Sequence, residues 1–300
     1  MRAALLVLSL AGLAACNPTR YGVDQGARVI TAAAPVFYTE PDVTFAREAM
    51  AANLKLVEGL LLVSSQNRDL LVRAAEGFCG YAFLFVEDDY EALAPSEEAQ
   101  RAPLAARASA FYDRAEDYAI RYLEVRRPGV RKALTGPPAE LEAVLGQMDT
   151  RDVPGLFWLA FAKAGYLNLN RDKVDAIASL GRIEAVLGRV IQLDERFFHG
   201  GAHLALGAIL SSRPRMLGGD PARGRREIER AIALSDGRFL LSKLLLARHY
   251  AVAVGDRALF EQVLREVAAA SPALLPEQRL ANEIARRRAE RYLGLADELF

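Results

Sequence analysis

Cysteine, histidine and tryptophan are scarce in this sequence, and a net charge is absent. The 300 residues include two cysteines, three histidines and one tryptophan, and 38 basic side chains balance 38 acidic ones. Two cysteines cannot form a disulfide scaffold or a four-cysteine metal site. Zero net charge argues against a nucleic-acid partner, because such binding rests on basic side chains that neutralise phosphates.

Threonine is rare as well, with six in the chain and none after Thr150, whereas alanine, leucine, arginine and glutamate are abundant. This composition favours helix over strand. Hydrophobic residues make up 52% of the chain and charged residues 25%, which excludes a disordered protein and suffices for a buried core.

Catalytic and cofactor-binding patterns are also missing. The sequence has no GxSxG elbow, phosphate-binding glycine loop or dinucleotide fingerprint. His199 and His203 are four residues apart and could share a helix face, but the glutamate of a zinc motif is absent, and Gly200 and Gly201 loosen the helix. We therefore predict no enzyme activity, no metal and no cofactor.

Residues 1–15 have the pattern of a secretory leader. Arg2 precedes an apolar stretch to Ala15 that is shorter than the ~20 residues of a membrane span. The stretch ends in Leu13-Ala14-Ala15-Cys16, which resembles a bacterial lipobox and predicts acylation of Cys16. The alternative is an ordinary leader with a chance cysteine. Asn17, in place of a retention-signal aspartate, favours the periplasmic face of the outer membrane over inner-membrane retention.

The rest of the chain divides into a tether and one helical domain. Residues 16–40 carry Pro18, Gly22, Gly26 and Pro35 without periodicity, which indicates a flexible tether. We expect Cys79 to be a small buried hydrophobe. From 41 to 300 apolar residues recur at helical spacing, and we expect helices over 42–64, 68–92, 97–126, 138–147, 154–168, 173–193, 198–212, 221–235, 239–254, 256–270 and 276–296.

These helices carry faint repeats. Residues 186–193 match residues 227–234 at a spacing of 41 residues. A small-x3-large-x2-Ala pattern, typical of tetratricopeptide helices, occurs twice, and a looser copy follows; the three triplets are Ala108, Tyr112, Ala115, then Gly224, Ile228, Ala231, and then Phe260, Leu264, Val267. We therefore predict an all-α, cryptic tetratricopeptide-like solenoid, with a looser helix at Gly224, where the repeat expects alanine.

A more specific pattern lies between residues 200 and 221. It consists of Gly200, Gly201, Ala202, His203, Gly207, Arg213, Pro214, Leu217, Gly218, Gly219, Asp220 and Pro221. With Phe157-Trp158-Leu159-Ala160 and Asn168-Leu169-Asn170 upstream, it resembles TRAP-transporter T-component proteins, which are periplasmic lipoproteins of tripartite transporters. The resemblance covers about residues 45–300 and is dense from 155 onward.

The resemblance implies an accessory lipoprotein of a TRAP-type uptake system. It implies a periplasmic solute-binding partner, a homotrimer, a ligand cleft and a small hydrophobic or amphipathic ligand. The membrane contact is expected through acyl chains at the N-terminus. The alternative is a tetratricopeptide-like scaffold for envelope assembly that has no ligand of its own.

The candidate ligand-binding residues each have a structural alternative. Under the resemblance the cleft candidates are Trp158, Phe161, Tyr166, Asn168, His203 and Arg213. An aromatic run is by default core packing, whereas an apolar wall with a few polar anchors suits a small molecule. Arg213 could hold an anionic ligand group or satisfy backbone carbonyls. We expect the turn of Gly218, Gly219, Asp220 and Pro221 to be structural.

Two charged runs are expected at the surface. Glu87, Asp88, Asp89 and Glu91 predict a solvated helix end, since their spacing does not fit a calcium loop. The arginines of 286–291 predict solvated surface or subunit salt bridges, with contacts to anionic headgroups or an acidic partner as the alternative.

Overall fold

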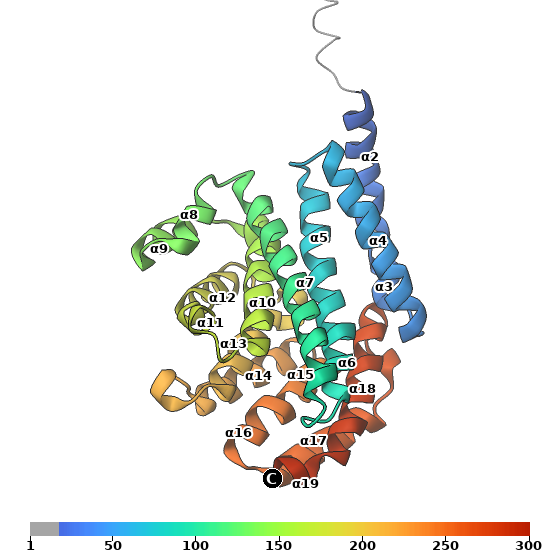
Figure 1. Ribbon diagram of the computed structural model, residues 1–300, viewed down its shortest axis with the longest axis vertical. Coiled ribbons are helices and arrows are strands. Elements are labelled where there is room, and N and C mark those ends of the chain that lie inside the picture. The colour runs from blue at the N-terminus through green and yellow to red at the C-terminus, as the bar shows by residue number, and fades with distance from the viewer. Residues whose placement is uncertain (1–17) are drawn as a thin grey trace, which may run out of the picture.

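The computed structural model describes residues 18–300, and all regular elements in that range are helical (Figure 1). The predicted leader and Cys16 lie outside these residues. Between residues 18 and 300 there is no strand, so the predicted all-α fold is confirmed. Within the same range, no helix has the length and apolar character needed to cross a membrane.

Most helices begin and end close to the predicted limits. The α-helices are α2 (Pro18–Ala33), α3 (Pro35–Thr39), α4 (Val43–Val63), α5 (Arg68–Tyr81), α6 (Glu87–Ala92), α7 (Glu98–Glu124), α8 (Val130–Thr135), α9 (Pro138–Gly146), α10 (Val153–Leu169), α11 (Val174–Ala178), α12 (Leu180–Asp194), α13 (Phe197–Ser212), α14 (Pro221–Leu234), α15 (Leu240–Leu245), α16 (Val252–Val254), α17 (Arg257–Ala269), α18 (Arg279–Gly294) and α19 (Ala296–Leu299).

Two π-helical segments and four 3₁₀ turns complete the chain. The π-helical segments are η1 (Ala82–Val86), between α5 and α6, and η4 (Leu246–Ala251), between α15 and α16. The 3₁₀ turns are η2 (Thr150–Asp152), η3 (Arg215–Leu217), η5 (Pro272–Leu274) and η6 (Pro276–Gln278). The sequence pattern did not predict α8, α19 or the break between α11 and α12.

Neighbouring helices pack side by side in a stack that curves back on itself. Along the stack α5 lies beside α7, α7 beside α10, α10 beside α12, and α13 beside α14. The last long helix, α18, packs on α17 and returns to contact α3 and α4 near the start of the described chain (Figure 1). Such stacking is compatible with tetratricopeptide-like repeats, in which each helix pair buries its apolar face on its neighbours.

The predicted repeat triplets lie in the core. Tyr112, Ile228 and Leu264, the middle residues of the three triplets, are fully buried, and the first and last residues of each triplet are buried too. Gly224, which the sequence suggested as a loose point of its helix, is buried at the contact between α13 and α14. A Cβ atom at Gly224 would lie 2.8 Å from the carbonyl oxygen of Gly207, so a methyl group has no room there.

The prediction of a flexible tether is wrong for residues 18–39, which form α2 and α3. The Asp24 carboxylate accepts hydrogen bonds from the Ser64 hydroxyl (2.6 Å) and the Asn67 amide (2.7 Å). Ala27 is fully buried, with Val23 and Ile30 packed on the core. These three residues form a narrow apolar stripe on α2, and the surrounding glycines hid it in the sequence.

Candidate functional site

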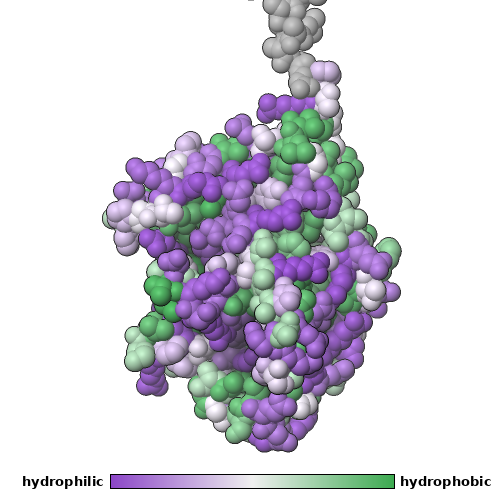
Figure 2. Space-filling model, in the orientation of Figure 1, coloured by the Kyte–Doolittle hydropathy of each residue, from purple (hydrophilic) through white to green (hydrophobic). Residues whose placement is uncertain are grey.

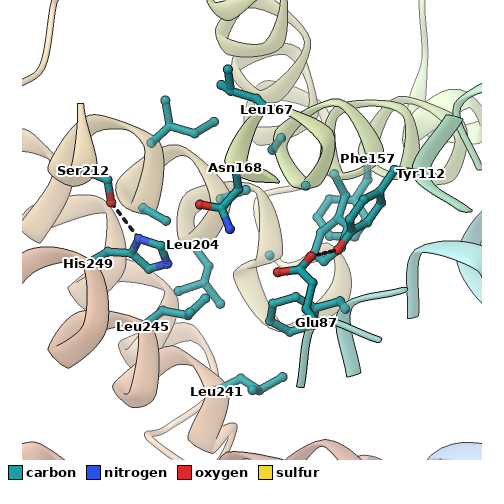
Figure 3. A pocket seen from close by; sticks show the side chains of 18 of the residues that line it. Glu87, Tyr112, Phe157, Leu167, Asn168, Leu204, Ser212, Leu241, Leu245 and His249 are labelled. Carbon is teal, nitrogen blue, oxygen red and sulfur yellow. Dashed lines mark hydrogen bonds between the residues drawn. The ribbon is translucent and has the colours of Figure 1, made fainter. Parts of the chain in front are cut away.

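A cavity of about 460 Å³ lies inside the curve of the stack. Its lining comes from segments far apart in the sequence, including α5 with η1, α7, α10, α13, α15 with η4, and α18. Figure 3 shows the leucines and aromatic rings that make up most of its wall and the few polar groups among them. The volume falls in the range of ~300–1,000 Å³ typical of small-molecule sites.

Aromatic rings from α10 and α13 build one wall of the cavity. The Phe157 and Trp158 rings lie 4.7 Å apart between centroids, and Phe161 lies 5.9 Å from Phe157. Phe198 packs on Trp158 at 5.0 Å in an edge-to-face arrangement. Such tilted contacts are favourable for rings and hold their positions, so this wall is pre-formed.

A kink in α13 places Phe198 in that wall. Phe198 and His199 adopt left-handed backbone angles, with φ of 48° and 58°, and Gly200 follows at 76°. Left-handed geometry is costly for residues with a side chain, especially a bulky one. The His199 ring stacks on Phe239 at 5.0 Å, whereas His203 lies beyond the kink on the regular part of the helix.

Glu87 and Tyr112 form a buried polar pair in the cavity lining, beside Phe157 in Figure 3. The Tyr112 hydroxyl donates a hydrogen bond to one Glu87 carboxylate oxygen, and Figure 3 shows the second oxygen turned toward the side of Asn168. Glu87 is 4% exposed, and burial raises its pKa to about 7. Burial also raises the pKa of Tyr112 well above its ordinary value, with the Glu87 charge adding to the rise. Glu87 can therefore exchange a proton near neutral pH.

A second buried carboxyl lies in the same lining. Glu76, on α5, accepts a hydrogen bond of 2.5 Å from the Tyr38 hydroxyl of α3 and pairs with Arg73 at 2.5 Å. Burial raises the pKa of Glu76. The hydrogen bond between Tyr38 and Glu76 ties α3 to α5, and both residues line the cavity.

The mouth of the cavity carries basic and amide groups. Among the lining residues, Arg171, Pro214 and Leu217 are exposed, and they mark the mouth between α10 and η3. The Arg171 guanidinium donates to the Asn168 side-chain oxygen. Inside the mouth, His249 shares a hydrogen bond of 2.6 Å with the Ser212 hydroxyl (Figure 3).

His249 is neutral in this environment. Burial, followed by the positive charges of Arg248 and Arg171, lowers its pKa to about 3. Desolvation by the surrounding lining, followed by the Arg248 charge, lowers the pKa of Arg171 although the residue reaches the surface. The two arginines thus act on the same side of the cavity.

Arg213 has partners within the protein. Its guanidinium donates to Glu184 at 2.6 Å and to the Gly218 carbonyl at 2.5 Å. The turn that follows is built as its residues suggest. Gly218 has a φ of 84°, Asp220 caps α14 by accepting from the Arg223 amide, and Pro221 begins the helix. Arg213 was expected either to satisfy backbone carbonyls or to hold an anionic ligand group. The carbonyl contact is present, and Arg213 is also part of the cavity lining.

The structure brings four of the six cleft candidates to the cavity. The four that line it are Trp158, Phe161, Asn168 and Arg213. Their contacts with a ligand stay a prediction. Tyr166 is not part of this lining and interacts with Lys173, whose amine lies 3.3 Å from its hydroxyl. His203 lies outside the lining as well, 2.6 Å from Glu227 and 3.4 Å from Glu195.

Sequence reasoning missed Glu87, Tyr112, Arg171 and His249 as lining residues. Glu87 was placed in a solvated acidic run, and that prediction is wrong. Its neighbours in the run are also paired, since Asp88 contacts Arg288 and Arg291, and Asp89 contacts Arg47. The surface prediction for the arginine cluster fails at Arg288, which is 2% exposed. One signal in the sequence could have indicated that Glu87 is buried. No glycine or proline separates it from the apolar residues Phe83–Val86, so it continues the same buried helix.

Cys79 is a free buried cysteine, as predicted. Its thiol lies 3.7 Å from the Trp158 carbonyl oxygen, and burial raises its pKa well above the ordinary value. No group of three or more histidine, cysteine, aspartate or glutamate side chains within residues 18–300 is arranged to hold a metal ion.

Comparison with known families places this geometry in context. A family model described as TRAP transporter T-component matches residues 39–300. The match begins at the end of α3 and includes every later element of the stack. No curated protein matches the chain.

Proposed function

The chain belongs to the TRAP transporter T-component family, and we propose that it binds a small apolar or amphipathic ligand in its cavity. It passes this ligand to or from a periplasmic solute-binding protein and performs no catalysis of its own. The observation that carries the proposal is the 460 Å³ cavity with its largely apolar lining. A scaffold with no ligand would gain nothing from leaving this space unfilled, since voids in protein interiors cost stability.

Ligand binding is testable with an uncharged fluorescent probe, N-phenyl-1-naphthylamine. Ala208 lies on α13 and lines the cavity, so Ala208→Phe places a ring inside it. We expect the variant to bind the probe at least about tenfold more weakly, a loss of ~1.4 kcal/mol. Ala222→Phe is the matched control, because Ala222 is exposed on α14 and does not line the cavity. Equal binding by both variants contradicts the proposal, as does the absence of probe binding to the wild type.

Mass spectrometry of organic extracts gives a second, independent measurement. Protein purified from its native host should release an amphipathic compound that Ala208→Phe does not carry. The identity of that compound also fixes the ligand, and an empty wild-type protein favours the scaffold alternative.

The partner is proposed to bind at the mouth of the cavity. We define the mouth rim as Val174, Met216 and Leu217, which are 78%, 90% and 46% exposed and follow the exposed lining residues Arg171 and Pro214 within three positions in the sequence. Exposed apolar side chains grouped beside polar ones are typical of protein interaction surfaces. A partner seated there would cover the cavity opening, so that ligand could pass between the two proteins without entering water.

We propose further that the protein is anchored by acyl chains on Cys16 at the periplasmic face of the outer membrane. The lipobox-like Leu13-Ala14-Ala15-Cys16 supports the anchor, and Asn17 supports the outer membrane. Metabolic labelling with an alkyne fatty acid should label the wild type and not Cys16→Ala. Labelling of both proteins, or of neither, contradicts the lipoprotein assignment.

The resemblance also supports a homotrimer, and the outer face of α2 to α4 offers a surface for it. Figure 2 shows green hydrophobic side chains along this side of the molecule. The exposed apolar residues of these helices include Tyr21, Val29, Val36, Phe45, Leu56 and Leu62. Light scattering during size-exclusion chromatography of the acyl-free protein measures the mass directly, and a monomer at all concentrations contradicts the trimer.

A further inference from the structure

Two arginines without an acidic partner lie near the mouth of the cavity. Arg171 lines the mouth, and Arg248 immediately precedes the lining residue His249. Within residues 18–300, neither guanidinium forms a salt bridge to a carboxylate. Arg171 donates only to the Asn168 amide oxygen, and Arg248 lies over the Tyr292 ring at 5.6 Å.

The two positive charges act on each other and on the group between them. The Arg248 charge disfavours the charged form of Arg171, and both arginines disfavour protonation of His249. Other arginines either pair with a carboxylate, as Arg213 does with Glu184, or donate to a backbone carbonyl, as Arg189 does to Met148. The Glu87 charge favours the charged form of Arg171 but forms no salt bridge with it, and two like charges beside a cavity mark a site at which an anion would be stabilised.

Neutral hydrogen-bonding groups complete the arrangement. The Asn168 oxygen accepts from Arg171, and the Asn168 side chain also hydrogen-bonds the Glu87 carboxylate, so Asn168 holds Arg171 in place at the mouth. Ser212 and His249 lie on the other side of the same opening, and Leu204 and Leu245 continue inward from them (Figure 3). The lining is therefore polar and basic at the mouth and apolar behind it.

We propose that Arg171 and Arg248 bind the oxyanionic head group of a single-tailed amphiphile, a carboxylate or a phosphate monoester, at the mouth of the cavity. The tail lies inward against Leu204, Leu241 and Leu245. This inference rests on the proposed function, because it assumes that the cavity takes a ligand, and it adds the charge and orientation of that ligand.

The head-group preference is measured on the wild-type protein. Dodecanoate, dodecyl phosphate, methyl dodecanoate and dodecylammonium are each titrated as competitors of bound N-phenyl-1-naphthylamine, and each is also titrated directly by calorimetry below its micellar concentration. We expect an anionic compound to bind at least about tenfold more tightly than the methyl ester and the ammonium, because hydrogen bonds to charged groups are the stronger ones. The two anions distinguish a carboxylate site from a phosphate site.

The arginines are tested by Arg171→Gln and Arg248→Gln. Each variant should weaken binding of the preferred anion about tenfold and leave methyl dodecanoate unchanged. Arg226→Gln is the matched control, since Arg226 is exposed on α14 and does not line the cavity. The wild-type series does not depend on any variant folding correctly.

The outcomes separate this inference from the proposed function. If the uncharged probe and methyl dodecanoate bind as well as the anions, the cavity is a ligand site and the anion inference is overturned. Unchanged anion affinity in both arginine variants overturns it as well. If neither the probe nor any of the four compounds binds, the proposed function fails, and the inference fails with it.

Discussion

The Arg288 guanidinium donates a hydrogen bond to Asp88 across 200 residues of sequence, with 3.1 Å between Nε and Oδ1. Arg288 also donates to the Phe83 carbonyl and lies over the Phe83 ring at 4.8 Å. These contacts join α18 to η1 and α6, the segment that carries Glu87 into the cavity. The closure of the stack is therefore tied to the geometry of the site.

Replacing Arg288 should destabilise the fold. Arg288→Met keeps much of the side-chain volume but leaves the Phe83 carbonyl and one side of Asp88 without a donor. We expect a loss of about 3 kcal/mol of unfolding free energy, at the low end for a broken buried ion pair because Arg291 still contacts Asp88. Urea unfolding measures it, with Arg287→Met as the control. Arg287 is exposed, so its replacement should change stability by less than about 0.5 kcal/mol.

Glu87 should make stability depend on pH near neutrality. Its pKa is about 7 in the folded protein against 4.5 ordinarily, so the folded state holds a proton that the unfolded chain has lost. Stability should therefore fall by about 3 kcal/mol between pH ~4.5 and ~7 as this carboxyl ionises. The groups that face it are Tyr112 and Asn168 on the cavity side and Glu91 and Arg288 behind it.

Glu87→Gln isolates this contribution, because it keeps an acceptor for Tyr112 but cannot ionise. As the pH rises from ~4.5 to ~7, the wild type should lose about 3 kcal/mol of unfolding free energy that the variant does not lose. A difference that is constant over this interval would show that Glu87 titrates at its ordinary pKa.

The helical fold could be predicted from the sequence because its signals are local. Apolar spacing, the Asp220-Pro221 cap and Ser271-Pro272 mark helices and breaks within a few residues of their positions. The repeat triplets also predicted core positions. The aromatic wall could be predicted in part because Phe157, Trp158 and Phe161 lie within one short run of the sequence.

The polar half of the site could not be predicted in this way, because long-range packing assembles it. Glu87 and Tyr112 are 25 residues apart and meet only when α6 and α7 fold against each other. Arg171 precedes the pattern of residues 200–221 in the sequence and His249 follows it, so no local spacing joins the two. The left-handed kink at Phe198 has no local cause in the sequence, since only Gly200 of its three residues favours that geometry.

The mouth rim should be required for the partner and dispensable for the ligand. Val174→Asp together with Met216→Asp puts charge into an apolar contact, and loss of such contacts commonly costs more than ~1 kcal/mol at an interface. We expect at least about fivefold weaker binding of the cognate solute-binding protein, measured by biolayer interferometry, with unchanged binding of the uncharged probe.

Val29→Asp is the control for the rim. Val29 is 70% exposed on α2 and does not line the cavity. Equal weakening by Val29→Asp would mean that the partner binds along α2 instead, and no weakening by the rim variant would contradict docking at the mouth.

The contact between α13 and α14 provides a sharp test of packing against helix propensity. Alanine favours helix over glycine by about 1 kcal/mol, so propensity alone predicts that Gly224→Ala stabilises the protein. The added methyl group would lie 2.8 Å from the Gly207 carbonyl oxygen. The contact is equally tight from the other helix, because a Cβ atom built at Gly207 would lie 2.7 Å from the Gly224 carbonyl oxygen. The helices must therefore move apart, and overpacking of this kind costs about 1–3 kcal/mol.

Gly188→Ala is the matched control, since Gly188 is inside α12 and a methyl group there meets nothing within 4 Å. We expect thermal unfolding to show a lower midpoint for Gly224→Ala and a higher one for Gly188→Ala. A stabilising Gly224→Ala would mean that α13 and α14 are not held at this distance.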